Sequence, residues 1–230
     1  MEVNEEKKLN NLLKGYNMLF YFTGSMITYE PTEECVVDFW QNGLLKRMPV
    51  SSSNPRFMIA LSLLRDTCPD KTTCARMMKD DFKKLFSGDE RALVPSSGSS
   101  YPDTSYGTNT GCDKVREFYD SYGWTSRFRG KYPDDHLGVE LLFLTRLVEK
   151  YMTLDDKVCR NEMQNEIIRF IDHHILTWVP KWNQLIQTHA DSIYYKGIGL
   201  LIYAIIEDIR ILIVTKAESD RSADDVRNLD

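Results

Sequence analysis

Two carboxylates and a histidine stand together at the start of an apolar-periodic segment of this sequence. Asp134, Asp135 and His136 directly follow Pro133, and a carboxylate beside an imidazole can act as an acid–base pair or bind a cation. Glu140 lies one helical turn after His136, a spacing that helical metal ligands also use. The turn therefore allows acid–base chemistry, recognition of a cation, or a helix cap beside a half-buried histidine.

The segment after this turn has the period of a buried helix. Its apolar residues recur at helical spacing, at Leu137, Leu141, Leu144 and Val148. Pro133 ends whatever precedes it, and Asp134 or Asp135 is expected to accept a hydrogen bond from an unpaired N–H of the new helix. We therefore expect the polar turn to form an open, negatively charged notch at the mouth of a pocket.

A second candidate group combines a histidine with two large aromatic side chains around a proline. His174 and Trp178 share a helical face, and Pro180 breaks the helix, so that Trp182 begins a new one at an angle. One interpretation is a corner between two helices that the tryptophans fill. The other is an aromatic wall of an apolar groove that holds a peptide.

A loop rich in hydroxyl groups and glycine is the third candidate. Residues 95–103 read Pro-Ser-Ser-Gly-Ser-Ser-Tyr-Pro-Asp, within a stretch over 87–111 that has no sustained period. Such a composition is more typical of turns than of a phosphate cradle. Loops of this length are usually functional or disordered, and Tyr101 and Tyr106 favour order. We therefore predict a long ordered loop.

The other periodic segments have the helical period, which predicts an all-α fold. We expect a single-domain bundle of roughly nine to eleven helices over residues 1–216, followed by a polar tail over 217–230. The expected helices cover residues 9–20, 32–44, 57–64, 71–86, 113–122, 134–148, 161–178, a segment that opens at Pro180, and 191–216.

Composition limits the classes of function. The chain has 230 residues, 42% of them hydrophobic, and a net charge of −5, which argues against nucleic acid and favours a cationic partner. The sequence contains no P-loop, GxGxxG, HExxH or GxSxG motif, and no third ligand accompanies His136 and Glu140. We therefore expect no metal and no other cofactor.

Location is expected to be cytoplasmic. Residues 1–8 are acidic and carry lysines, unlike a secretory leader, and the most apolar stretch, 198–206, is too short to span a bilayer. The five cysteines form no CxxC pair, so we predict free thiols in a reducing cytoplasm.

The order of these pieces resembles the TorD/DmsD family of NarJ-like chaperones for redox enzymes. The resemblance covers residues 75–206 and rests on the helix end at 81–88, the segments 115–119 and 122–124, the turn at 133–137 and Glu140. It closes on a corner that matches the family's His-Leu-x-x-Trp-x-Pro-x-Phe pattern, with Ile175 for leucine and Trp182 for phenylalanine.

The resemblance implies an all-helical chaperone without catalysis. Such proteins bind the twin-arginine signal peptide of a molybdopterin oxidoreductase precursor, an anaerobic reductase or dehydrogenase. They support cofactor insertion and prevent premature export. By resemblance, the signal-peptide site consists of Ser97, Gly98, Tyr101, Asp103, Asp135, His136, Gly138, His174, Trp178 and Trp182. Some members carry Glu or Trp in the loop where this chain has residues 96–100, which indicates a different client.

Other interpretations remain open at this point. One is an assembly factor or accessory subunit that contacts the mature oxidoreductase rather than its leader; another is a hydrolase that uses Asp135 and His136. No motif indicates a nucleotide. The chain is expected to be a monomer or a domain-swapped dimer, with the loop over 87–111 as the hinge.

Overall fold

The computed structural model of the chain describes residues 2–32, 34, 48–65, 70–87, 92–102 and 110–227. The expected helix over 32–44 falls mostly outside this range, as do Asp103, Cys35 and Cys68. The described part contains eight α-helices and only isolated bridges in place of strands, which confirms the all-α prediction. They are α1 (Glu2–Thr28), α3 (Pro55–Arg65), α4 (Lys71–Phe86), α5 (Thr110–Ser121), α6 (Leu137–Thr153), α7 (Lys157–Phe170), α8 (Val179–His189) and α9 (Ile193–Arg227).

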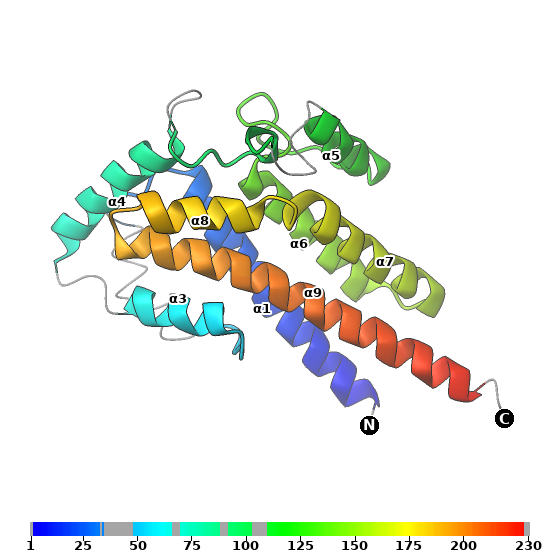
Figure 1. Cartoon of the computed structure of the whole chain (residues 1–230). Coiled ribbons are helices and arrows are strands. Elements are labelled where there is room, and N and C mark those ends of the chain that lie inside the picture. Colours follow the sequence, from blue (N-terminus) through cyan, green and yellow to red (C-terminus); the bar gives the residue numbers. More distant parts are fainter. Residues whose placement is uncertain are drawn as a thin grey trace.

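The bundle is organised around α9, which runs through its centre (Figure 1). This helix contacts α1, α3, α4, α7 and α8, and the segment 198–209 contributes isoleucines and leucines that are almost completely buried. A helix that is apolar on nearly all faces is stable only when neighbours cover it. At Gly197 a Cβ would overlap the side chain of Leu64, so the glycine lets α3 pack closely against α9.

Several helix ends differ from the predicted ones: α1 extends beyond the expected 9–20 at both ends, and α6 extends past 148. The polar tail expected over 217–230 is helical as far as Arg227, because Ala217 is still buried and Asp220 pairs with Lys216 one turn earlier. The helix expected over 161–178 is interrupted: α7 ends at Phe170 and a π-helical turn spans Ile171–Ile175. Pro180 then lies in the first turn of α8, where its missing N–H leaves no intrahelical bond unmade.

The cysteines do not all follow the prediction of free thiols. Cys112 and Cys159 are free, as predicted, but the buried Cys74 is disulfide-bonded, which is uncommon in a reducing cytoplasm. Among the residues that the structure describes, no helix has both the length and the apolarity needed to span a bilayer.

The start of α9 is held by a carboxylate from another helix. Asp81 of α4 is 2% exposed and accepts the backbone N–H groups of Asp191, at 3.0 Å, and Ser192, at 2.7 Å. Both residues lie just before Ile193, where α9 begins, and the side chain of Asp81 supplies an acceptor for both N–H groups. The contact ties α4 to the N-terminal end of the central helix.

We expect Asp81→Ala to lower the free energy of unfolding by about 2–4 kcal/mol. The substitution removes the acceptor of two N–H groups and leaves a cavity where the side chain was. Urea unfolding followed by circular dichroism measures the change. The matched control is Asp80→Ala, on the exposed side of the same helix turn. Equal unfolding midpoints for the two variants would contradict this role of Asp81.

Candidate functional site

The turn before α6 is capped by His136. Its Nδ1 accepts the backbone N–H of Gly138 at 3.1 Å, and α6 begins at Leu137. The expectation that Asp134 or Asp135 caps this helix is wrong, because both carboxylates are engaged elsewhere. Asp134 forms an ion pair with Arg116 of α5 at 2.6 Å, and Asp135 faces the loop that precedes α5.

Asp135 joins this loop to the turn through a short set of hydrogen bonds. Its Oδ2 accepts the N–H of Ser99 at 2.7 Å, and its backbone carbonyl accepts the N–H of Gly98 at 3.1 Å. In return, the N–H of Leu137 donates to the carbonyl of Ser96 at 2.7 Å. Residues 96–99 and 135–137, here called the clasp, thus pair around an antiparallel bridge between Ser97 and His136.

The clasp buries the carboxylate that sequence analysis placed in an open notch. Asp135 is 0% exposed and His136 is 6% exposed, so the expectation of an open notch is wrong for this conformation. The reason is the 3₁₀ turn Gly98–Ser100, which lies over the carboxylate and leaves only Ser99 and Ser100 at the surface.

Asp135 is incompletely satisfied inside the clasp. Its Oδ1 is buried without a hydrogen-bond partner, and no cation in the described part of the chain pairs with its carboxylate. Burial, and next the charge of Asp135, raises the pKa of the Cys112 thiol on α5. A buried carboxylate of this kind is costly unless a donor or a cation reaches it.

Negative charge concentrates around this turn. Tyr119 is buried and donates its hydroxyl to the Asp134 carbonyl at 2.9 Å. Its pKa is raised well above the usual value by burial and then by the charges of Glu140, Asp134 and Asp135. Glu140 is, like Asp135, 0% exposed. Three carboxyl groups, those of Asp134, Asp135 and Glu140, therefore lie around the start of α6, where their oxygens suit a partner that donates hydrogen bonds.

The two tryptophans fill the corner between two helices and do not form the wall of a peptide groove. Trp178 and Trp182 are fully buried, and the Trp178 Nε1–H donates to the His174 carbonyl at 2.8 Å. The His174 ring lies against Phe118 and Phe170, with ring centroids 5.5 and 5.3 Å apart. Neither tryptophan walls an open groove in this conformation.

Tyr101 connects the corner to the clasp. It is buried, stacks on Trp178 with ring centroids 5.3 Å apart, and donates its hydroxyl to the Pro95 carbonyl at 2.8 Å. The structure thus joins the predicted residues Ser97, Gly98, Asp135, His136 and Gly138 in one cluster, with Trp178 behind Tyr101. His174 and Trp182 belong to the supporting core.

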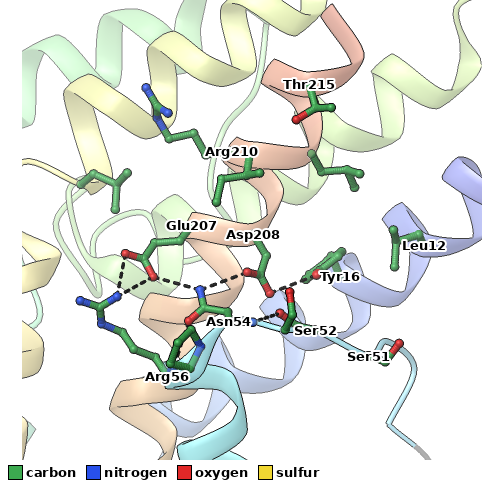
Figure 2. Close-up of a pocket in the computed structure, with 15 residues that line it drawn as sticks. Leu12, Tyr16, Ser51, Ser52, Asn54, Arg56, Glu207, Asp208, Arg210 and Thr215 are labelled. Carbon is green, nitrogen blue, oxygen red and sulfur yellow. Dashed lines mark hydrogen bonds and ion pairs between the residues drawn. The ribbon is translucent and has the colours of Figure 1, made fainter. Parts of the chain in front are cut away.

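Sequence analysis did not predict an open cavity that lies beside α9, away from the clasp. It has a volume of about 860 Å³ and lies between α1, residues 51–56 and α9 (Figure 2). Glu207 and Asp208 supply its carboxylates, and Leu12 and Ile211 are among its apolar residues. The available signal was the sudden change from the apolar stretch 198–206 to adjacent carboxylates on the same helix.

A network of neutral and charged donors fixes the two carboxylates of this cavity. The amide of Asn54 donates to both Glu207 and Asp208, at 3.1 Å each, and Arg56 bonds both oxygens of Glu207 (Figure 2). The Tyr16 hydroxyl donates to Asp208 at 3.1 Å, and burial and this carboxylate raise the tyrosine pKa. The carboxylates are therefore held in place before any ligand arrives.

The chain is similar in sequence to a protein family and to two named chaperones. A family model described as "Nitrate reductase delta subunit" matches residues 55–184, more than half of the chain. A protein of Aliivibrio salmonicida (strain LFI1238) named "Chaperone protein TorD" is 20% identical over 199 residues, which cover 84% of this chain and 93% of the relative. A second "Chaperone protein TorD", from Aliivibrio fischeri (strain ATCC 700601 / ES114), is 26% identical over 137 residues, 57% of this chain and 62% of the relative.

The buried histidines make stability depend on pH. Burial lowers the pKa of His136 to about 4, and burial with nearby cationic groups lowers that of His174 to about 4. The folded chain keeps both rings neutral, whereas the unfolded chain takes up protons below about pH 6.5. The contribution of the two neutral histidines to the free energy of unfolding is therefore complete above about pH 6.5. It falls by about 1 kcal/mol per histidine per pH unit as the pH drops toward 4.

Urea unfolding between pH 7.5 and 4.5 tests this expectation. His136→Asn keeps a side-chain acceptor for the Gly138 N–H without a titrating ring, so the loss of stability in acid should decrease by about half. Gln184→Ala, on the exposed side of α8 and without a titrating group, is the control and should leave the slope unchanged. An identical pH slope for wild type and His136→Asn would show that His136 does not titrate as described.

Proposed function

The chain belongs to the nitrate reductase delta subunit family, and from this premise we propose that it is a cytoplasmic chaperone for the precursor of a molybdoenzyme. In this role it binds the precursor's twin-arginine signal peptide, allows the cofactor to be inserted and delays export. The role involves no catalysis, in keeping with the chaperone name of the relatives that cover most of the chain.

One observation supports the clasp as the signal-peptide site. Asp135 is a fully buried carboxylate whose Oδ1 has no hydrogen-bond partner and which pairs with no cation in the described residues. An arginine side chain supplies a positive charge and two parallel N–H donors, which match the two oxygens of a carboxylate. A leader arginine would therefore satisfy the atom that the free chain leaves unsatisfied.

In this proposal, the tip of the loop over residues 97–100 moves to give access to Asp135. Val94 and Tyr101 are buried and anchor the loop on both sides of residues 97–100. Lifting this tip breaks the two hydrogen bonds from Gly98 and Ser99 to Asp135. The bond to the carbonyl contributes about 0.5–1.5 kcal/mol and the bond to the carboxylate about 1.5–3 kcal/mol. Their sum is smaller than the roughly −8 kcal/mol of a micromolar complex.

The remaining predicted residues support this site in the proposal. Gly138 lets α1 come close, since a Cβ there would overlap the Thr28 hydroxyl. His136 caps α6 and so fixes the turn that carries Asp135. Tyr101 and Trp178 form apolar surface below the loop tip, which would contact the apolar run of the leader once the tip lifts. We keep Asp103, outside the described residues, as the second proposed carboxylate.

Isothermal titration calorimetry with a synthetic leader tests this function. We expect a peptide with an Arg-Arg pair and an apolar run to bind with a sub-micromolar Kd. A Lys-Lys version should bind about tenfold more weakly, because an ammonium group cannot form the bidentate pair. Asp135→Asn should lower the affinity for the Arg-Arg peptide by about tenfold or more.

The matched control is Asp134→Asn, next to Asp135 but paired with Arg116 on the outer side of the turn. This variant should bind the leader within about twofold of wild type. If no twin-arginine leader binds, the proposed function fails. If Asp135→Asn binds as well as wild type while the leader does bind, the function stands and the assignment of the clasp fails.

A further inference from the structure

The open cavity beside α9 has an unbalanced negative charge. Arg56 is held by both oxygens of Glu207 and lies over the Tyr203 ring, 4.5 Å from its centroid. Arg210 is engaged by Asp172 through two hydrogen bonds and points away from the cavity carboxylates (Figure 2). Asp208 receives only neutral donors and pairs with no cation among the described residues. One carboxylate charge therefore remains uncompensated, in a place that solvent can reach.

Apolar side chains continue from this carboxylate along the groove between α1 and α9. Leu212 and Thr215 line both the first cavity and a second one of about 460 Å³ nearer the chain ends. Ile211, at 58% exposure, borders the groove on α9, and Leu9 and Leu12 line it on α1. This apolar surface lies open in the free chain, whereas the clasp must open first.

The far end of the groove is also negative. In the second cavity Arg160 pairs with Glu6 and Lys216 pairs with Asp220, which leaves Glu5 without a cation among the described residues. From Asp208 to Ser219 is eleven helical steps, or roughly 16 Å. An extended peptide of about five residues covers that distance.

We infer that this groove binds an extended segment of a client polypeptide that carries basic residues at its ends and apolar residues between them. One arginine or lysine pairs with Asp208, the apolar side chains lie on Leu12, Ile211 and Leu212, and a second basic residue meets Glu5. An anion does not fit this site, because both arginines near it are already engaged by carboxylates. The site is distinct from the clasp and does not depend on the proposed leader binding.

The probe for this site is the peptide acetyl-Arg-Leu-Leu-Leu-Arg-amide, titrated into the full chain by calorimetry. Asp208→Asn should weaken its binding about tenfold, because a charge-assisted hydrogen bond is lost. Raising NaCl from 50 to 500 mM should weaken binding as well, since the ion pair is partly exposed. A peptide with Gln in place of both arginines should bind weakly. Its affinity for wild type and for Asp208→Asn should be about the same, because it has no charge to pair with Asp208.

Ile211→Ser provides a variant whose folding is not at risk, because the side chain is mostly exposed. It should weaken the probe about threefold through lost apolar contact. The matched control is Ile193→Ser, at the other end of α9 with 50% exposure, and the carboxylate control is Asp120→Asn on the exposed side of α5. Both controls should bind within about twofold of wild type.

Lack of probe binding, or equal binding by wild type and Asp208→Asn, would overturn the inference. Asp135→Asn separates it from the proposed function, since this variant should bind the probe normally and the twin-arginine leader poorly. Probe binding that depends on Asp208, combined with no binding of any leader, would uphold the groove and reject the proposed function.

Discussion

The buried carboxylate of Asp135 is the constraint on which the arrangement of this face depends. Its side chain accepts the N–H of Ser99, and its backbone carbonyl accepts the N–H of Gly98. Leu137, the first residue of α6, donates its N–H to the Ser96 carbonyl. These bonds fix the loop against α6 and bring Tyr101 onto Trp178, so that loop, turn and corner form one unit. The cost is a carboxylate oxygen with no partner in a low-dielectric interior.

This arrangement suits the proposed function, in which the protein must both bind and release its client. A closed site opens in a fraction of the molecules, and a ligand that binds only the open form shifts the population toward it. The apparent affinity is reduced when only a fraction of the molecules is open, so under the proposed function the hydrogen bonds of the clasp limit how tightly a leader binds. The groove beside α9 needs no such opening, because its carboxylates and apolar residues are already at least partly exposed.

Sequence periodicity was sufficient for the helices, since an apolar stripe such as Leu137, Leu141, Leu144 and Val148 has few other solutions. The family resemblance, not periodicity, assigned Asp135, His136 and Trp178 to one site; in the structure the first two lie in the clasp, and Trp178 stacks on Tyr101. Sequence analysis failed on their exposure, because whether a loop covers a carboxylate depends on backbone contacts between residues 36 positions apart. The Glu207–Asp208 cavity was missed for the same reason: Asn54 and Tyr16, which complete it, are remote in sequence.

Amide hydrogen exchange at Ser99 is the most direct test of whether a leader displaces the loop from Asp135. In the free chain its N–H is bound to Asp135 and should exchange slowly, as should the N–H of Leu137 bound to Ser96. With saturating twin-arginine leader, NMR should show Ser99 losing protection, while the amide of Val94, behind the loop tip and bound to Leu85, keeps it. Unchanged protection of Ser99 in the saturated complex would contradict the claim that the leader takes the place of the loop on Asp135.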